Sequence, residues 1–441
     1  MLRSRLRSRS RSPVAGRRGA VGSLLDLDYV RNLYHGRSLA DHVAGRASQA
    51  YTPDHDGVYH LTQATEPRRT SAGFLLEHGA TNAVPNAWLH GAAAGTPGAL
   101  PTGWAVTVPT GTTLSVEAVT THKGLPVIDL RLRGAATGGG FQIRFGGLSD
   151  IPAAAGQNWA FSAFLHLLET SGNLLDLRLA LQALNGSAIG LGANDSGNVL
   201  PQAAAWSRPA TNLVGTPAGT AKIVGLLTAD QDFSGSVALD ERIRIAVPQI
   251  EPWNPLWCDA PFPTTPIRTE GAAAARDFEH AHVSLDGLGV TNAFTGIVIG
   301  RMPPAIRRLG THVEFVSAAF APRHILGLRT DQAGAAMELR IRAFDEEAGV
   351  TARVPLPAPG SRFCAAFSVD DRAVALSVNG GAVGSVTSTH PVFDGYTDMF
   401  VCGTWGGVHQ AEAPVERVIV FPGPVPNGDL PACSVPSRWD P

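Results

Sequence analysis

The stretch DFEHAH, residues 277–282, is the best candidate in this sequence for a metal site. Carboxylates and imidazoles are common ligands of Zn²⁺. In a strand, however, Asp277 and Glu279 share one face, while His280 and His282 share the other. The four groups could then converge on one ion only if the chain bends. The pattern therefore favours a polar strand edge, with a metal site as the alternative.

A second oxygen-rich stretch is YTPDHDGVYH, residues 51–60. Asp54, Asp56 and the neighbouring backbone could hold a calcium ion, because Ca²⁺ prefers oxygen ligands. The stretch lacks the twelve-residue EF-hand pattern with its closing Glu, so it is more typical of a surface turn. We expect no cofactor and no metal ion, with a calcium ion at this turn as the alternative.

Catalysis requires a constellation of groups. The sequence contains no GxSxG, HExxH or GxxxxGK[ST] motif, and no GxGxxG between a strand and a helix. A pair of carboxylates such as Glu117 and Asp129 could meet across strands, as glycoside hydrolysis needs, but nothing singles these two out. We therefore expect no catalytic residues and no enzyme.

The elements that would position any site are short strands. Apolar stretches of five to eight residues recur from about residue 84, separated by Gly, Pro, Asn and Thr. In VIDLRLR, residues 127–133, apolar and charged residues alternate, which places Ile128, Leu130 and Leu132 on the buried face of a sheet. Strands of this length and spacing indicate a sandwich or jelly roll.

A proline-rich crossing at residues 251–266 ends this first group of strands, because Pro cannot occupy a central strand. The strand pattern then resumes and continues to about residue 423. In RFCAAFSVDDRAVALSVNGG, residues 362–381, two apolar runs flank Asp370-Asp371 and end at Asn-Gly-Gly, which predicts antiparallel hairpins. The chain therefore reads as two β-sandwiches.

Composition supports an all-β protein of more than one domain. The chain has 441 residues, with 49 Gly, 32 Pro and 7% aromatic residues, a balance that fits many strands joined by turns. The four cysteines match neither a CxxC zinc site nor a dense disulfide framework, so we expect reduced thiols, with Cys364 and Cys402 in the core. No stretch has the apolar length of a signal-peptide core or of a membrane span. We therefore expect synthesis in the cytoplasm.

The net charge is only −2, but its distribution is uneven. The first 18 residues contain many arginines and no acidic residue, and alternating Arg and Ser predicts a disordered basic arm. Docking onto an acidic patch of a larger assembly is the favoured role of this arm. Non-specific nucleic-acid contact and a plain solubility tail remain alternatives.

Several stretches resemble a recurring pattern in structural proteins of tailed phages and prophages. GFLLEHGATN, residues 73–82, resembles their G-L-L-I-E-x-x-R-T-N sequence, although residues 78–80 depart from it and Ala80 replaces the usual Arg. GAAAGTPGALPTGW, residues 91–104, resembles the segment that opens a carbohydrate-binding-type jelly roll in those proteins. Residues 248–277 are similar to their closing stretch, and FSVDDRAVALSVNGGAVG in the second half resembles a concanavalin-like or laminin-G-like sandwich.

The resemblance implies a fibre, head spike or tail protein of a phage or gene-transfer-agent particle, oligomeric and located on the virion. Its partners would be host capsule or surface polysaccharide and other virion subunits. The hydropathy pattern and the small net charge predict no membrane span and, apart from the alternative named for the arm, no nucleic-acid partner. A tailspike-type hydrolase or lyase that degrades polysaccharide, and a purely structural subunit, are the alternatives. The expected parts are a basic arm (1–23), a lead-in segment for virion attachment (24–80), a jelly roll (81–275), a concanavalin-like sandwich (276–424) and a tail (425–441).

Sugar recognition requires aromatic platforms for the apolar faces of the rings and planar polar groups for the hydroxyls. Most tryptophans should lie in the core, as the strand-like settings of Trp159 and Trp206 indicate. Trp405 differs, because it sits in a Gly-flanked loop. The residues proposed for carbohydrate contact are Trp405, Tyr396, Trp88 and Trp104.

Overall fold

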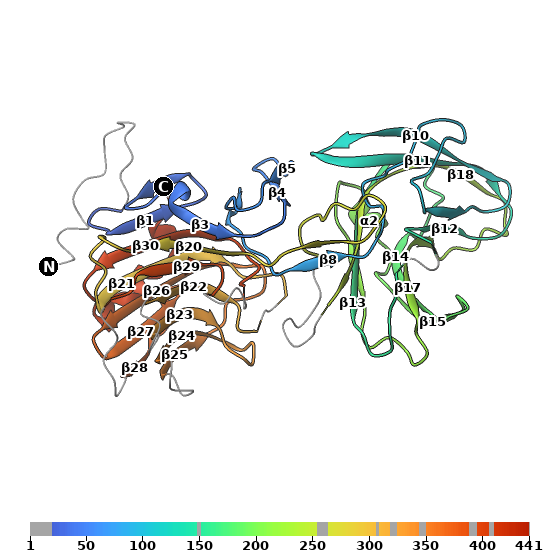
Figure 1. Ribbon diagram of the computed structural model, residues 1–441. Coiled ribbons are helices and arrows are strands. Elements are labelled where there is room, and N and C mark those ends of the chain that lie inside the picture. The colour runs from blue at the N-terminus through green and yellow to red at the C-terminus, as the bar shows by residue number, and fades with distance from the viewer. Residues whose placement is uncertain are drawn as a thin grey trace.

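The computed structural model describes residues 20–147, 151–253, 263–305, 308–317, 324–343, 350–387, 395–404 and 410–440. The chain is nearly all β, with 49% of its residues in strands and 4% in helices. Figure 1 shows two lobes, of which one carries both chain termini and the other lies beyond a narrow neck. The predicted all-β class with two sandwiches is confirmed.

The lobe without termini is a jelly roll of two five-stranded antiparallel sheets. One sheet has the order β10 (Thr112–His122), β11 (Leu125–Ala136), β18 (Val237–Pro252), β13 (Trp159–Glu169) and β16 (Ala210–Leu213). The other has the order β15 (Gly190–Asp195), β14 (Arg178–Leu184), β17 (Lys222–Ala229), β12 (Phe141–Arg144) and β9 (Ala105–Thr107). The short helix α2 (Leu200–Ala203) lies between β15 and β16 in the chain.

The structure confirms the alternation of apolar and charged residues that we identified at residues 127–133. Ile128, Leu130 and Leu132 are at most 1% exposed and belong to the core between the two sheets. The charged residues of the same strand point away from that core and pair with charges on β18, for example Arg131 with Asp240 at 2.6 Å. Apolar burial therefore fixes the strand register, because a slip by one residue would exchange the two faces.

The other lobe is a sandwich of two larger sheets. The first contains β2 (Leu33–His35), β1 (Leu25–Asp28), β30 (Val415–Pro422), β21 (Ala293–Arg301), β26 (Arg362–Asp370), β27 (Ala373–Val378) and β28 (Gly384–Thr387), with β6 (Arg69–Thr70) and β7 (Gly73–Phe74) beside β30. The second contains β25 (Val350–Pro355), β24 (Ala336–Ala343), β23 (His324–Thr330), β22 (Thr311–Val316), β29 (Asp398–Val401), β20 (His280–Ser284) and β3 (His42–Gly45).

Strands from both ends of the segment expected at residues 24–80 as a separate lead-in belong to this sandwich. β1 pairs with β30 and β3 pairs with β20, so both sheets incorporate strands from the N-terminal part of the chain. Leu25 and Leu27 are fully buried in the core. The sequence boundary differs from the structure because β1 spans only four residues and finds its partner about 390 residues away in the chain, a pairing that local pattern cannot show.

The jelly roll is thus inserted into the sandwich through a neck. β8 (Ala80–Asn82) leads into the jelly roll and β19 (Ala274–Arg276) leads out of it, and the two pair antiparallel. A hairpin of β4 (Ala50–Pro53) and β5 (Tyr59–Thr62) lies above the neck in Figure 1. The neck therefore joins sequence segments that are almost 200 residues apart.

The expected tail at residues 425–441 packs onto the sandwich as far as it is described. Val425, Leu430 and Cys433 form a small core with Ile297 and Cys364 on the outer face of the first sheet. Leu430 and Cys433 lie in helix α3 (Leu430–Cys433), which follows the 3₁₀ turn Asn427–Asp429. Further 3₁₀ turns span Leu39–Asp41 and Pro436–Arg438.

The predicted hairpins in residues 362–381 are present. β26 and β27 pair around a turn in which Asp371 has φ of 46°, and Asn379 and Gly380 adopt positive φ beyond β27. Cys364, Cys402 and Cys433 are free and buried, as expected for reduced thiols, whereas Cys258 lies outside the described residues.

Candidate carbohydrate-binding pocket

Two of the aromatic residues proposed for sugar contact are core residues instead. Tyr396 is 4% exposed and packs edge-on against Phe294 and Phe315. Trp104 is 7% exposed, and its indole Nε1 donates to the carbonyl oxygen of Asn86 at 3.1 Å. Neither ring offers a free face, because both pack into the cores of their lobes.

Trp405, the preferred candidate, lies outside the described residues. Trp159 is buried as expected, while Trp206 is only partly buried and stacks on Phe164 with 5.2 Å between ring centroids. Trp88 is partly buried and packs against the ring of Tyr51, with 4.8 Å between centroids. Tyr396 and Trp104 thus lie in the cores of different lobes, and Trp88 backs Tyr51, a residue that lines a surface pocket.

The two metal candidates have other roles in the described structure. Asp54 Oδ1 accepts hydrogen bonds from the backbone N–H groups of Asp56 and Val58, which makes the stretch a turn. In β20 the side chains of His280 and His282 share one face, as predicted, and Glu279 is buried among arginines. Among the described residues, no group of three His, Cys, Asp or Glu side chains could hold a metal ion.

The carboxylates of Glu117 and Asp129 each have another partner in the structure. Asp129 is 1% exposed and accepts from Arg242 and Arg244 at 2.7–2.9 Å. Glu117 accepts a hydrogen bond from Ser115 at the bulge of β10. Asp129 is thus a structural partner of the arginines on β18.

The neck contains a pocket of about 380 Å³. One wall comes from the β4–β5 hairpin and the residues before it, and the other comes from the segment that leads into β19. Its lining residues are Ser48, Gln49, Tyr51, Leu61, Pro266, Ile267, Arg268, Thr269, Glu270, Ala272, Ala274 and Ala275. The volume falls within the range of roughly 300–1,000 Å³ that small-molecule sites occupy. We call this cavity the neck pocket.

Apolar and polar groups converge in the neck pocket. Tyr51 is 8% exposed and is backed by Trp88, and Leu61, 37% exposed on the hairpin, presents the open apolar surface. The guanidinium of Arg268 pairs with the carboxylate of Glu270 at 2.5 Å, and about half of each of these two side chains is exposed. Burial raises the pKa of Tyr51, while the nearby Arg268 lowers it. The pocket therefore combines apolar surface with planar hydrogen-bonding groups.

The two walls are fixed by hydrogen bonds. Thr269 Oγ1 accepts from the backbone N–H of Ala87 at 2.8 Å, and its carbonyl oxygen accepts from the N–H of Trp88 at 3.1 Å. On the opposite wall, Arg46 donates to the carbonyl oxygen of Ser48, whose hydroxyl accepts from the N–H of Asp277 at 2.9 Å. These contacts fix the positions of both walls, so the pocket is preformed.

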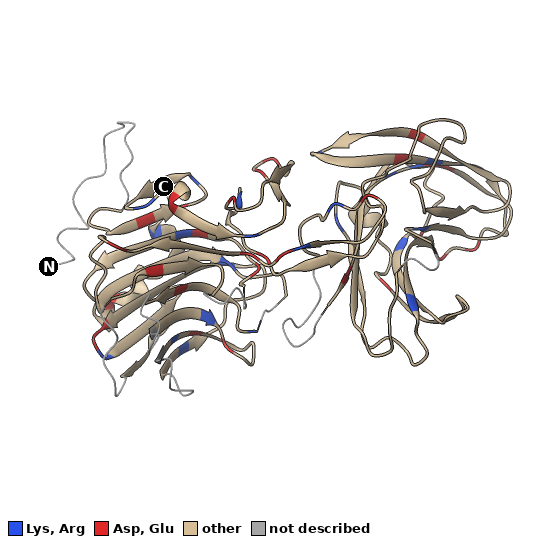
Figure 2. Cartoon of the chain, viewed as in Figure 1, with Lys and Arg blue, Asp and Glu red and all other residues tan. Residues whose placement is uncertain are grey.

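A buried ion network lies directly behind the neck pocket. It consists of three arginines and two glutamates, each at most 5% exposed: Arg46, Arg68, Arg276, Glu77 and Glu279. Figure 2 shows residues of both charge signs where the lobes join. Arg68 pairs with both glutamates, and Thr265, beside the pocket, donates to Glu77 through its hydroxyl at 2.6 Å.

The electrostatics of this network favour the charged form of Glu77. Burial alone would raise the pKa of Glu77, but Arg276 and Arg68 together with the hydrogen bonds from Thr265 hold it well below its usual range. Buried charges are tolerated only when they are paired and hydrogen-bonded. Since Glu77 precedes β8 and Arg276 ends β19, the network ties together the two chain segments that cross the neck.

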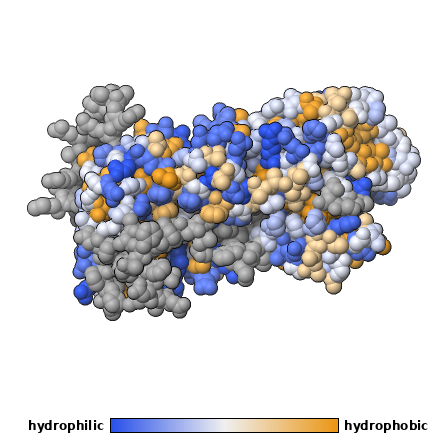
Figure 3. Space-filling view, viewed as in Figure 1, coloured by the Kyte–Doolittle hydropathy of each residue, from blue (hydrophilic) through white to orange (hydrophobic). Residues whose placement is uncertain are grey.

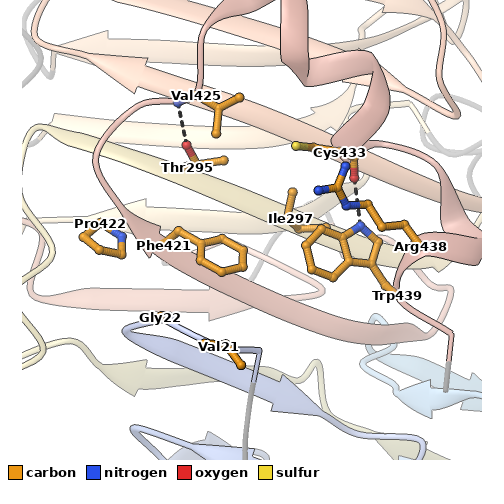
Figure 4. Close-up of a pocket in the computed structure, with 10 residues that line it drawn as sticks. All are labelled: Val21, Gly22, Thr295, Ile297, Phe421, Pro422, Val425, Cys433, Arg438 and Trp439. Atoms are coloured by element: carbon orange, nitrogen blue, oxygen red, sulfur yellow. Dashed lines mark hydrogen bonds between the residues drawn. The ribbon is translucent and has the colours of Figure 1, made fainter. Parts of the chain in front are cut away.

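A second pocket, of about 160 Å³, lies on the outer face of the sandwich beneath the C-terminal segment (Figure 4). It is lined mainly by apolar groups, among them Ile297, Phe421 and Trp439. The polar atoms nearby are engaged, because Thr295 Oγ1 accepts from the N–H of Val425 and Trp439 Nε1 donates to the carbonyl oxygen of Cys433. The hydroxyls of a sugar would find few partners there.

Sequence reasoning missed the residues of the neck pocket. Tyr51 lies in the stretch considered for calcium, and Arg268 and Glu270 lie in residues 248–277, which we interpreted only as a closing stretch similar to that of phage structural proteins. The short spacing of Arg268 and Glu270 was a visible signal, but their proximity to Tyr51 depends on a hairpin more than 200 residues earlier.

Neither a protein-family model nor a curated protein matches this chain. Solved structures share low similarity with it. Domain 4 of AbnA, a GH43 extracellular arabinanase from Geobacillus stearothermophilus, in complex with arabinotriose, is 19% identical over 37% of this chain and 77% of its own, with a TM-score of 0.29. Domains LG4-5 of the mouse laminin alpha1 chain are 10% identical over 62% of this chain and 83% of their own, with a TM-score of 0.23.

The N-terminal CBM22 tandem domain of Xyn10C from Paenibacillus barcinonensis is 10% identical over 76% of this chain and 98% of its own, with a TM-score of 0.23. At these TM-scores, none of the three assigns a ligand or an activity to this chain. No helix in the described part of the chain is long and apolar enough to span a membrane.

Proposed function

We propose that this protein is a polysaccharide-binding subunit of a phage-like particle and that the neck pocket holds part of the glycan. The observation that carries the proposal is the convergence of Tyr51, Leu61 and the Arg268–Glu270 pair in one preformed cavity of about 380 Å³. Apolar surface suits the C–H faces of a sugar ring, and the planar ion pair suits its hydroxyls.

The assignment to a particle rests on the resemblance of three stretches to phage structural proteins. Two of them, residues 73–82 and 248–277, contain the strands β8 and β19 that form the neck. These two stretches therefore meet at the neck between the lobes. A particle with many copies would raise the avidity of weak single-site binding by roughly 10² to 10⁴.

The surface agrees with recognition by discrete polar sites. On the face shown in Figure 3, apolar residues form separate patches among hydrophilic ones. The single carboxylate that lines the neck pocket, Glu270, is paired with Arg268. Hydrolysis by a two-carboxylate mechanism would need a second acidic group beside it.

The test is binding of the chain lacking residues 1–19 to host cells with and without their surface polysaccharide, with released reducing ends assayed in the same tubes. We expect saturable, polysaccharide-dependent binding without sugar release. Arg268→Ala and Glu270→Ala together should weaken it at least tenfold. The matched control is Arg133→Ala, which removes an exposed arginine paired with Asp240 on the jelly roll and should leave binding unchanged.

Three outcomes would contradict the proposal in different ways. Release of oligosaccharides would make the protein a polysaccharide-degrading enzyme. Binding that is equal on cells without polysaccharide would leave a structural subunit. Binding that depends on polysaccharide but not on Arg268 and Glu270 would place the glycan elsewhere on the chain.

A further inference from the structure

The sandwich carries a hollow of about 440 Å³ on the outer face of β26, β27 and β28. Its floor consists of two cross-strand rows, which the sheet register defines. One row is Ser368, Ala375 and Ser385, and the other is Asp370, Ala373 and Thr387. The central residue of each row is alanine, and its small side chain leaves the space of the hollow. We call this hollow the sandwich groove.

The turn segment 424–427 forms the wall of the groove. The N–H of Val425 donates to Thr295 Oγ1 at 2.9 Å, and the same hydroxyl donates to the carbonyl oxygen of Gly423 at 2.9 Å. Pro424 and Pro426 restrict the backbone on either side. The wall is therefore anchored to β21, and the groove is preformed.

Three polar side chains of the floor, Asp370, Ser385 and Thr387, are exposed, whereas Ser368 is 4% exposed. None of these three forms a hydrogen bond or ion pair within the described part of the chain. Among the described lining residues there is no lysine or arginine. An anionic ligand would meet the charge of Asp370 without compensation, whereas a neutral ligand could donate hydroxyl hydrogens to that carboxylate.

We propose that the sandwich groove is a second saccharide-binding site, specific for neutral sugars. Two exposed hydroxyls and one exposed carboxylate on the floor match the alternating donors and acceptors of a pyranose chain, and the prolines of the wall offer apolar surface to its C–H faces. This inference extends the proposed function to the second lobe. One chain would then bind glycan at two sites on separate lobes.

The experiment measures saturation-transfer NMR and dissociation constants for maltohexaose, cellohexaose and mannohexaose, with alginate oligomers as the acidic comparison. It uses the chain whose neck pocket carries Arg268→Ala and Glu270→Ala. We expect residual binding of at least one neutral hexaose. Adding Asp370→Asn and Ser385→Arg should weaken that residual binding at least tenfold. The matched control, Asp371→Asn, changes the neighbouring turn residue and should have no effect.

The two proposals fail separately. If the neck variant binds no neutral hexaose, or if its residual binding survives the groove substitutions, the sandwich groove is not a saccharide site. Preferential binding of alginate oligomers that depends on Asp370 and Ser385 would also overturn it. If instead the neck substitutions leave binding unchanged and the groove substitutions abolish it, the neck pocket is not a saccharide site, whereas the sandwich groove is one.

Discussion

Arg276, the last residue of the strand that leaves the jelly roll, pairs with Glu77 just before the strand that leads into it, with 3.0 Å between Nη1 and Oε2. Both side chains are buried. The same Nη1 donates to Thr265 Oγ1 at 2.6 Å, and Nη2 donates to the carbonyl oxygen of His78 at 3.1 Å. One guanidinium thus connects both crossings of the neck with the wall of the neck pocket.

Substitution of Arg276 by Met should lower the free energy of unfolding by about 3–5 kcal/mol, because it leaves Glu77 buried without one of its counter-charges. Urea unfolding monitored by circular dichroism checks this value. The control is Arg268→Met in the exposed pair with Glu270, which should cost no more than about 1 kcal/mol. Equal effects of the two variants would show that the buried network does not stabilise the neck.

His312 should make the sandwich sensitive to mild acid. Burial lowers the pKa of His312 to about 4, and neither ring nitrogen has a hydrogen-bond partner among the described residues. In the unfolded chain its pKa is about 6.5, so the unfolded state binds the proton first as the pH falls. The contribution of neutral His312 to stability is therefore complete above about pH 6.5 and lost towards pH 4, by about 3 kcal/mol.

The measurement compares the wild-type protein with His312→Leu in urea unfolding from pH 7.5 to pH 4. The variant should gain stability relative to the wild-type protein as the pH falls. His60→Leu is the control, because His60 is exposed and pairs with Asp54. A constant difference between wild type and His312→Leu over this pH range would contradict the prediction.

The buried thiols should be unreactive in the folded protein. Burial raises the pKa of Cys364 and of Cys402 to about 12 and also raises the pKa of Cys433. Because the thiolate is the nucleophile, the Cys258→Ser variant should react with a thiol-specific disulfide reagent only after denaturation. Three thiols should then appear in urea. Rapid labelling of any of them at pH 8 in native buffer would refute the burial of that residue.

Truncation should separate the basic arm from the fold. Deletion of residues 1–19 removes none of the contacts described here and should leave the melting temperature unchanged. Deletion of residues 1–45 removes β1, β2 and β3, and with them the buried side chains of Leu25 and Leu27. The longer deletion should lower the free energy of unfolding by more than about 5 kcal/mol, because each buried leucine contributes about 2–5 kcal/mol. Equal melting temperatures of the two truncated proteins would show that these strands do not stabilise the sandwich.

Local sequence pattern is enough to predict the secondary-structure class and several local features. Alternation in residues 127–133 predicts which side chains face the core, because the side-chain period of a strand is two. Asn379 and Gly380 predict a tight turn, because both residue types tolerate positive φ. The strand-like settings of Cys364 and Cys402 correctly indicate burial. All of these features depend on neighbours within a few residues.

The tertiary structure alone decided how the lobes are built and where the pockets lie. β1 joins β30 and Glu77 meets Arg276 only because the jelly roll is inserted between them in the chain. Burial of Tyr396 and Trp104 likewise follows from sheets that pack over them. The prediction of sugar contact from aromatic residue type alone therefore placed both side chains wrongly. The neck pocket and the sandwich groove arise from pairings and packing between distant segments, which a one-dimensional pattern does not contain.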